Sequence, residues 1–289
     1  MPVRHLWIAV LVVAVLLLAP LPLGSLSRNW FALTNTIENA GHPLVFWWLT
    51  SRLLPPVRSR VKGLWSAYLL TLVLAIAFGV GTEYLQSHVG RDASWEDVRN
   101  DAFGAMLALA LHARMDLRKS GHESWQSLAT VTGFVLASLA AFPLVWTVAA
   151  YTGRLWNFPE IWSADSVLAR RFSYWKQGNH PGLVIEEPAR DWRGYTALQV
   201  QVRSLLASGT EVRIRVHDQK HNRQFLDRYD KSFVLPDSTE RTLSIPLEAI
   251  KHGPNSRDLD LSAVRGIIIF QEGSHPSPNF VVQRIWLVP

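Results

Sequence analysis

Two unlike patterns of hydrophobic positions divide this chain at about residue 153. Before that point, long apolar runs are separated by short charged loops. After it, short segments alternate apolar and polar residues, with turn-forming residues between them. Runs of about 20 apolar residues are typical of membrane-spanning helices, whereas a period of two residues is typical of half-buried β-strands. The sequence therefore predicts an all-α membrane domain over residues 1–153 followed by an all-β domain.

The apolar runs of the first half predict five membrane-spanning helices. Three of them, at about 6–24, 64–82 and 128–151, reach the required length without a charged residue. Two shorter ones, at about 40–54 and 98–113, begin with polar groups, which is compatible with a span whose polar end faces other helices. A cleaved signal peptide is the alternative for the first run. However, that run exceeds the apolar core of about 7–15 residues that such signals have, and no Ala-x-Ala-like site follows it.

The basic residues of the loops predict the orientation of the five helices. With a cytoplasmic N-terminus, eight loop Arg and Lys residues lie inside and three lie outside, which is the asymmetry expected of membrane proteins. The inside set is Arg4, Arg52, Arg58, Arg60, Lys62, Arg114, Arg118 and Lys119, and the outside set is Arg28, Arg91 and Arg99. Omitting either of the two shorter helices removes the asymmetry. We therefore expect a multi-pass protein of a bacterial inner (cytoplasmic) membrane whose C-terminal domain is periplasmic.

The second half predicts a β-sandwich of the jelly-roll type over residues 164–289, joined through a linker at 154–163. Clear alternation in LQVQVRS and EVRIRVH places one apolar set on one side of two strands, namely Leu198, Val200, Val202, Val212, Ile214 and Val216. Eight short strands broken by Gly, Pro, Asn and Asp are typical of a two-sheet sandwich. The expected strands are 169–175, 182–187, 197–203, 210–217, 232–235, 241–246, 266–271 and 280–287.

Composition excludes several kinds of chemistry. The chain has no cysteine, which excludes disulfides, thiolate metal ligands and a cysteine nucleophile. Its 13 Trp, 12 Phe and 6 Tyr supply too much apolar surface for a disordered chain. The formal charge of +6 would suggest a nucleic-acid partner in a soluble protein. Here much of the excess lies in membrane loops, and basic residues of the β-domain are interspersed with acidic ones, so we expect no nucleic-acid partner.

Polar residues gather at the outer ends of the predicted helices. Glu83 and Gln86 are three residues apart at the end of the span at 64–82 and share one helical face. Asp97, Asn100 and Gly104 share a face of the span at 98–113. Two of these helix ends therefore turn polar side chains toward the same side of the membrane.

The flanking residues extend this set. Ser94 precedes Asp97 by three residues, which resembles a capping box with Asp in place of Glu. Glu38 and His42 are four residues apart at the start of the span at 40–54, and Arg91 lies in the loop between two helices. A glycine at position 104 would let a neighbouring helix approach closely. The expected polar cluster is Glu38, His42, Glu83, Gln86, Arg91, Asp97 and Asn100.

The chemistry of this polar cluster leaves three uses open. In an enzyme, Glu83 or Asp97 would act as base, His42 as acid or base and Arg91 as anion clamp. The same residues would also suit a binding site for a lipid or peptide headgroup, or merely cap helices and pair them. No spacing typical of a metal site is present, since His42, Glu83, His88 and Asp97 form no tight pair. We expect no metal and no cofactor.

The order and spacing of these residues resemble a known family. The pattern E-x2-Q-x4-R-x5-D-x2-N-x3-G, which runs here from Glu83 to Gly104, resembles the signature of the VanZ-like membrane proteins. That family also has an acidic residue four positions before a histidine. Glu38 and His42 stand there, with Glu where Asp is usual and Asn39 where Lys is usual. The resemblance covers about residues 30–113 and implies a small multi-span protein of the bacterial envelope. The namesake is associated with resistance to a teicoplanin-type antibiotic, and no reaction is assigned to the family.

The β-domain carries a second resemblance. The segments DWRGYTALQVQV, EVRIRVHDQ and SRDLDLSAVRGIIIF resemble galactose-binding-like jelly rolls and carbohydrate-binding modules. In such domains Trp192, Tyr195 and Leu198 are core residues, and the segment 258–261 is a turn into the next strand. The resemblance implies sugar binding, which needs an exposed aromatic ring and planar hydrogen-bonding side chains. Candidates by residue type are Trp175, Arg215, Asp218, Arg228 and Glu272, and no cluster of calcium ligands stands out.

Three functions follow as hypotheses from this organisation. In the first, the chain is a VanZ-like envelope protein that binds a cell-surface glycan, a lipid-linked glycan or a glycopeptide, linked to glycopeptide resistance or envelope maintenance. In the second, it is a membrane-embedded enzyme that acts on an envelope precursor through the polar cluster. In the third, it is a scaffold whose sandwich binds another protein. The sequence leaves open whether any bond is made or broken, and it leaves the oligomeric state open.

Overall fold

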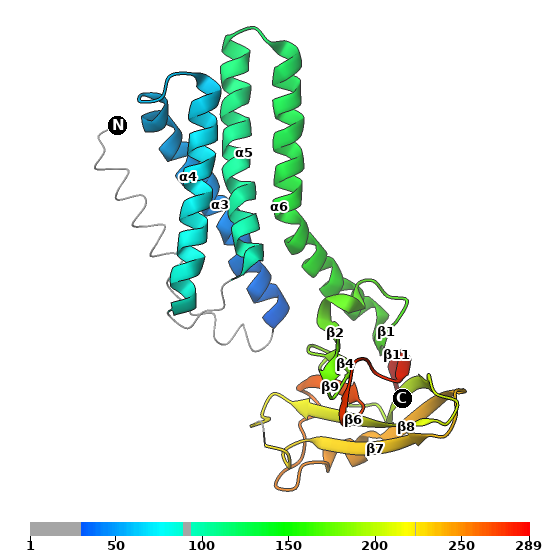
Figure 1. Cartoon of the computed structure of the whole chain (residues 1–289). Coiled ribbons are helices and arrows are strands. Elements are labelled where there is room, and N and C mark those ends of the chain that lie inside the picture. The colour runs from blue at the N-terminus through cyan, green and yellow to red at the C-terminus, as the bar shows by residue number, and fades with distance from the viewer. Residues whose placement is uncertain (1–29, 89–93, 223) are drawn as a thin grey trace. The chain divides into compact units, whose positions relative to one another are not determined.

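The computed structural model describes residues 30–88, 94–222 and 224–289 (Figure 1). The first expected span, at 6–24, and Arg91 of the polar cluster lie outside these residues. The described chain divides into two compact units: a helical unit that runs to Val145, and a β-unit of residues 146–289 together with residues 30–32. A helical part followed by β-sheets agrees with the predicted fold class.

Four long helices precede the sheets in the described chain. They are α3 (Phe31–Arg58), α4 (Leu64–His88), α5 (Trp95–Lys119) and α6 (Glu123–Asn157). Each is longer than the apolar run that predicted it, because flanking residues at one or both ends extend the helix beyond the apolar part. The tight turns before α4 and α6 use Gly63 and Gly121, whose φ angles of 97° and 77° lie in the left-handed region that favours glycine.

Two of these helices, α4 and α6, are long and apolar enough to cross a membrane. Most of the side chains in their apolar stretches face outward, among them Leu69 on α4 and Phe134 on α6. α3 and α5 fall short of the same apolarity, and α5 carries charged residues in its first and last turns. Among the described residues, two of the expected spans therefore meet the length and apolarity of a membrane helix.

Close contacts between small residues hold the helical unit together. A side chain at Gly104 of α5 would overlap the backbone carbonyl of Pro43 in α3, so the close approach expected at this glycine is confirmed. Beside this crossing, Phe46 of α3 packs with Ala75 of α4 and Ala105 of α5 in a small buried cluster. α5 also lies alongside α6 and α4 (Figure 1).

The β-unit is a sandwich of two antiparallel sheets. One sheet has the order β1-β11-β5-β8, with β1 (Glu160–Ser163), β5 (Ala197–Ser204), β8 (Glu240–Pro246) and β11 (Phe280–Val288). The other has the order β2-β4-β9-β6-β7, with β2 (Ser173–Lys176), β4 (Gly182–Ile185), β6 (Thr210–Asp218), β7 (Tyr229–Leu235) and β9 (Val264–Phe270). Smaller elements are β3 (Gly178–Asn179), β10 (Ser274–His275), the 3-10 helix η1 (Ala169–Phe172) and α7 (Leu247–Lys251).

The core of the sandwich lies between the two sheets. The alternating residues of β5 and β6, such as Val200 and Ile214, are fully buried there, as their spacing predicted. Trp192 and Leu198 are also fully buried core residues, and Tyr195 packs against this core. The Trp192 indole donates a hydrogen bond of 2.6 Å to the carbonyl of Ala189, which satisfies its polar atom.

Two segments differ from the predicted boundaries. The segment 154–163, expected as a linker, contains the end of α6 and the strand β1, which pairs with β11. Ile161 and Trp162 bury their side chains in the sandwich core, and this apolar burial stabilises the segment as a strand. Residues 169–172, expected as the start of a strand, form η1, and β2 begins at Ser173.

Candidate functional site

A buried histidine–aspartate pair joins two helices of the helical unit. The imidazole Nδ1 of His42 on α3 is 2.9 Å from the carboxylate Oδ1 of Asp101 on α5. The two residues are only 7% and 1% exposed. Asp101 was not among the predicted cluster. It lies four residues after Asp97 and three before Gly104, so the helical spacing of α5 already placed it on the cluster's face.

A glycine makes room for this pair. A Cβ atom at Gly79 of α4 would lie 2.7 Å from Oδ2 of Asp101, so only a residue without a side chain fits there. This second oxygen has no hydrogen-bond partner among the residues that the structure describes. A buried carboxylate oxygen in this state is available to a proton or to a hydrogen-bond donor of a ligand.

Glu83 makes the hydrogen bond that a capping box would give to Asp97. In a capping box, Asp97 would bind the backbone amide of Ser94. Instead, Oε2 of Glu83 on α4 accepts that amide hydrogen bond at 2.8 Å. The Ser94 hydroxyl accepts from the amide of Glu96 at 3.1 Å, which caps α5 as a serine at this position should. The contact joins the end of α4 to the start of α5.

The other members of the predicted cluster are placed as follows. Gln86 and Asn100 are buried, Glu38 is partly buried, and Arg91 is not described. Both Asp97 and Glu83 lie near enough to His42 to interact with it electrostatically. The structure therefore gathers several acidic groups around one imidazole. Among the residues described, no three His, Asp or Glu side chains are placed to hold a metal ion.

A second candidate site is the outer face of the five-stranded sheet. The strand register places one row of side chains across all five strands, in the order Tyr174, Val184, Ile268, Arg215 and Asp230. The alternate residues of these strands face the core, so this row points away from it. The row begins with a tyrosine that is 50% exposed, continues over two aliphatic residues and ends in a charged pair.

A neighbouring row runs parallel to the first, in the order Lys176, Gly182, Phe270, Arg213 and Ser232. The side chain of any other residue at Gly182 would overlap the backbone of β9. The glycine therefore allows close packing of β4 on β9. A small pocket at the end of this row is lined by Glu211, Arg213, Ser232, Gln271 and Glu272.

Asp230 organises the charges on this face. Its carboxylate, which is almost fully buried, accepts hydrogen bonds from Nε of Arg213 at 2.7 Å and from Nε of Arg215 at 2.9 Å. Arg228 also pairs with it, at 3.3 Å, and Arg213 in addition pairs with the exposed Glu272. Because Asp230 uses only the Nε groups of Arg213 and Arg215, it fixes both side chains without occupying their terminal nitrogens.

Aromatic rings lie beside these guanidinium groups. The centroid of Phe225, which is 55% exposed, is 4.8 Å from the guanidinium carbon of Arg228 and 5.9 Å from that of Arg213. Phe270 lies 4.7 Å from the guanidinium carbon of Arg215. The face therefore combines apolar rings with planar donors and acceptors, which are held in place by cation–π contacts as well as by ion pairs.

The structure divides the predicted sugar-binding residues into two groups. Arg215, Arg228 and Glu272 lie together on the face just described. Trp175 points to the opposite side of β2, where its ring lies 6.1 Å from that of Phe280. Asp218 is fully buried at the end of β6. Sequence reasoning missed other residues of this face, such as Arg213, Asp230, Tyr174 and Phe225, although the alternation of β6 already placed Arg213 beside Arg215.

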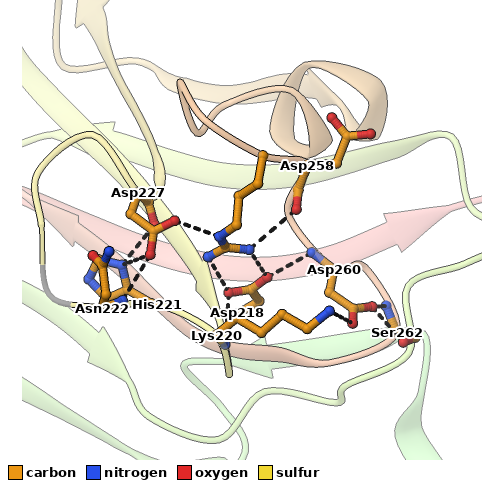
Figure 2. A network of polar contacts seen from close by, with 9 residues as sticks. Asp218, Lys220, His221, Asn222, Asp227, Asp258, Asp260 and Ser262 are labelled. Carbon is orange, nitrogen blue, oxygen red and sulfur yellow. Dashed lines mark hydrogen bonds and ion pairs between the residues drawn. The ribbon is translucent and has the colours of Figure 1, made fainter.

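Asp218 belongs to a separate network of polar contacts (Figure 2). Arg257 binds both of its carboxylate oxygens, and Nε of Arg257 donates to Oδ1 of Asp227 at 2.6 Å. Burial alone would raise the pKa of Asp218, but the hydrogen bonds from Arg257 and from the amide of Asp260 outweigh it and lower this pKa. Asp218 is therefore an ionised partner of Arg257 and has no oxygen left for a ligand.

The segment before β9 contributes to the same network. The amide of Asp260 donates to Asp218 at 2.8 Å, and Oδ1 of Asp260 accepts from the amide and hydroxyl of Ser262 (Figure 2). Leu259 is buried in the sandwich core. The turn into β9 runs from Asp260 to Ala263, whose amide donates to the Asp260 carbonyl at 3.0 Å, so it lies two residues later than the expected turn at 258–261.

Comparison with protein-family models finds no match to this chain, so the resemblance to VanZ-like proteins gains no support there. Comparison with curated proteins also finds no match. Among solved structures, the chain is similar over its C-terminal part to a family 11 carbohydrate-binding module from Clostridium thermocellum in complex with a β-1,3-1,4-mixed-linked tetrasaccharide. The identity is 25% and the TM-score 0.31, with 40% of this chain and 72% of that chain covered.

Two further solved structures extend this comparison. The family 11 module of a cellulosomal cellulase of Clostridium thermocellum matches with 26% identity and a TM-score of 0.30, over 40% of this chain and 71% of that one. A family 43 arabinoxylan arabinofuranohydrolase from Bacillus subtilis, in complex with cellotetraose, matches with 12% identity and a TM-score of 0.25, over 39% of this chain and 20% of that one. The chain is thus similar, over its β-sandwich, to family 11 carbohydrate-binding modules.

Proposed function

We propose that this chain is an integral membrane protein whose sandwich binds a glycan on the outer face of the five-stranded sheet. The observation that carries this proposal is the row from Tyr174 to Asp230, which places an exposed ring, an aliphatic strip and a fixed charged pair along one line. A pyranose ring has an apolar C–H face and a rim of hydroxyl groups. Such a ring would pack its C–H face on Tyr174 and turn its hydroxyls to the guanidinium of Arg215, which Asp230 holds in place.

The charged groups suit the hydroxyl rim because they are planar and held in place. Guanidinium groups donate several hydrogen bonds in a fixed plane, and carboxylates accept them. Asp230 holds Arg213 and Arg215 in place before any ligand arrives, so binding costs less side-chain entropy. Phe225 offers a second exposed ring at the charged end of the face.

The membrane part of the proposal rests on hydropathy and charge. The outward-facing apolar residues of α4 and α6 need an apolar surrounding, and lipid supplies one. The charge asymmetry of the loops supports a topology of five spans with a periplasmic sandwich. In that location the available ligands are cell-surface glycans, lipid-linked glycans and glycopeptides. A VanZ-like role in glycopeptide resistance or envelope maintenance is compatible with these ligands.

Glycan binding is tested with the full chain in nanodiscs on an array of envelope polysaccharides and peptidoglycan fragments. We expect Arg215→Gln and Tyr174→Ala each to weaken binding at least tenfold. Arg203→Gln is the matched control, since Arg203 is an exposed arginine of β5, in the other sheet. Absence of binding to every glycan, or equal losses in the test variants and the control, would contradict the proposal and favour a scaffold that binds protein.

The topology is tested separately. We expect a reporter enzyme that works only in the periplasm to be active when it is fused after Pro289. Activity of a cytoplasm-specific reporter at the same position would place the sandwich inside the cell and remove envelope glycans from the set of ligands.

The buried His42–Asp101 pair favours a second candidate function, an enzyme embedded in the membrane. A carboxylate that holds Nδ1 of an imidazole turns Nε2 away from itself and prepares it for proton transfer. Turnover of a lipid-linked peptidoglycan precursor would be compared between the wild type and Asp101→Asn, which keeps a hydrogen bond to His42. Loss of turnover with unchanged thermal stability supports catalysis. Absence of turnover in the wild type, or unchanged turnover in the variant, assigns the pair to helix packing.

A further inference from the structure

A groove between α3 and α5 is separate from both candidate sites. Its walls include Trp47 of α3 and Ala108, Leu111, Arg114, Met115 and Arg118 of α5. The residues from α5 recur at spacings of three and four, so they form one stripe along that helix. The groove therefore runs lengthwise along α5, toward its C-terminal end.

The groove changes character along its length. Its apolar part contains Trp47 and Leu111, which are 39% and 37% exposed although they are large hydrophobic residues; Met115, which is 50% exposed, lies between Arg114 and Arg118 in the sequence. Its other end carries the side chains of Arg114 and Arg118, which are both exposed. The surface is thus apolar at one end and strongly basic at the other.

The two arginines lack an acidic partner in the described part of the helical unit. Asp116, the acidic residue between them in sequence, accepts hydrogen bonds from Arg58 at 2.9 Å and from the Tyr68 hydroxyl at 2.7 Å. Within the described residues, neither Arg114 nor Arg118 has an acidic partner within 4.0 Å. The net charge at this end of the groove is therefore positive, and an anion would complement it.

The macrodipole of α5 does not account for this arrangement. Basic residues stabilise a helix when they lie in its last turn, as Arg118 and Lys119 do. Arg114 lies before that turn, and the dipole gives no reason for exposed apolar residues to continue the stripe. A ligand with a negative head and an apolar tail would satisfy both ends of the groove.

We propose that this groove binds an anionic glycerophospholipid, with the lipid phosphate between Arg114 and Arg118 and an acyl chain along Leu111 and Trp47. Basic pockets between membrane helices are known surfaces for anionic headgroups. The proposal rests on the membrane placement proposed above and is independent of glycan binding. It assigns a lipid class to a surface that the glycan site does not use.

The test uses the full chain in nanodiscs of phosphatidylcholine with increasing phosphatidylglycerol. The retained lipids are then identified by native mass spectrometry. We expect the wild type to retain phosphatidylglycerol at least fivefold over phosphatidylcholine, and the double variant Arg114→Gln/Arg118→Gln to lose this preference. Lys119→Gln is the matched control, because it removes one positive charge at the same helix end without lining the groove. Trp47→Ala should shorten lipid retention while keeping the headgroup preference.

Further measurements separate the outcomes. Soluble glycerol phosphate, which has the head without the tails, should not compete for the groove; effective competition would indicate a free-phosphate site and overturn the lipid assignment. Equal loss of preference in Lys119→Gln would indicate general surface charge and also overturn it. Circular dichroism checks that the double variant is folded. If the protein resists carbonate extraction from membranes but shows no preference for phosphatidylglycerol, only the lipid proposal is refuted. If carbonate extracts the protein, the membrane placement is refuted as well.

Discussion

The guanidinium of Arg257 binds both carboxylate oxygens of Asp218, with Nη1 2.6 Å from Oδ2 and Nη2 2.8 Å from Oδ1. Its Nε reaches Asp227 at the same time. One side chain thus joins the end of β6, the loop before β7 and the loop before β9. The two carboxylates are almost fully buried, so their charges depend on this arginine.

Replacing this arginine should destabilise the sandwich strongly. Arg257→Gln leaves two buried carboxylates without their positive partner, and removal of one partner from a buried ion pair costs about 3–5 kcal/mol. Arg257→Lys should be intermediate, since an ammonium keeps the charge but not the planar geometry. Urea unfolding followed by hydrogen exchange of the β-strands measures the change in the free energy of unfolding.

The control for this prediction is Arg241→Gln. Arg241 and Asp237 form an exposed pair 3.3 Å apart, and such surface pairs contribute about 0–1 kcal/mol. Similar losses in both variants would contradict the role given to Arg257.

The contact between α3 and α5 depends on the absence of a side chain at position 104. Gly104→Ala should destabilise the helical unit by about 1–3 kcal/mol, because its Cβ would overlap the carbonyl of Pro43. Gly81 of α4 has open space at its Cβ position, so Gly81→Ala should be neutral or stabilise by up to about 1 kcal/mol through helix propensity. Thermal loss of helical circular dichroism in detergent compares the two variants. The same sign of change in both would contradict this account.

His217 should make the stability of the sandwich depend on pH. Burial, together with the neighbouring charges of His221 and Arg265, lowers the pKa of His217 to about 4. The unfolded chain therefore binds a proton at this residue between pH 6.5 and about 4, while the folded state does not. Stability should fall by about 1 kcal/mol for each pH unit as the pH drops through this window.

The matched variant is His217→Gln, which should remove this slope. Hydrogen exchange of β6 and β9 at several pH values reports it. The lowered pKa values of Asp218 and Asp227 act in a different window, since their contribution is present above pH 3.8 and is lost only as the pH falls below it. An unchanged slope between pH 6.5 and 4 in the variant would refute the assignment to His217.

Glu187 ties the end of α6 to the sandwich within the β-unit. Its buried carboxylate accepts hydrogen bonds from the Tyr151 hydroxyl and from the amide of Ala32 at 3.0 Å, and Arg265 lies 3.4 Å away. Tyr151→Phe should cost about 1–3 kcal/mol, because a buried acceptor loses a donor. Faster hydrogen exchange in residues 146–157 would confirm this, whereas a change confined to the strands would not. Tyr195→Phe is the control, since no hydrogen bond of its hydroxyl takes part in this contact.

Local hydrophobic patterns in the sequence predicted much of the fold. Alternation in β5 and β6 placed their buried residues correctly, and apolar runs located α4 and α6, because burial on one side of a strand or helix imposes a fixed period. The spacing at Gly104 also indicated a close helix contact correctly. The segment 154–163 was misread as a linker, because its Ile161 and Trp162 are buried by pairing with β11, far away in the sequence.

The sequence predicted only part of each candidate site. Helical spacing indicated His42, Glu83 and Asn100 as members of the cluster. The pairing of His42 with Asp101 depends on how α3 packs against α5, which the spacing does not specify. On the sandwich, residue type alone grouped Arg215 with Asp218 and Trp175. The strand register separated them and supplied Asp230 instead.

The sequence by itself determined the division into an apolar helical part and an alternating β-part, because hydrophobic periodicity is a local property of the chain. It also determined which side of each strand is buried. Only the tertiary structure decided which polar residues share a site, since His42 and Asp101 are 59 residues apart in the sequence and Arg215 meets Asp230 through the register of two strands. Those pairings depend on helix crossings and strand register, which arise when the whole chain packs.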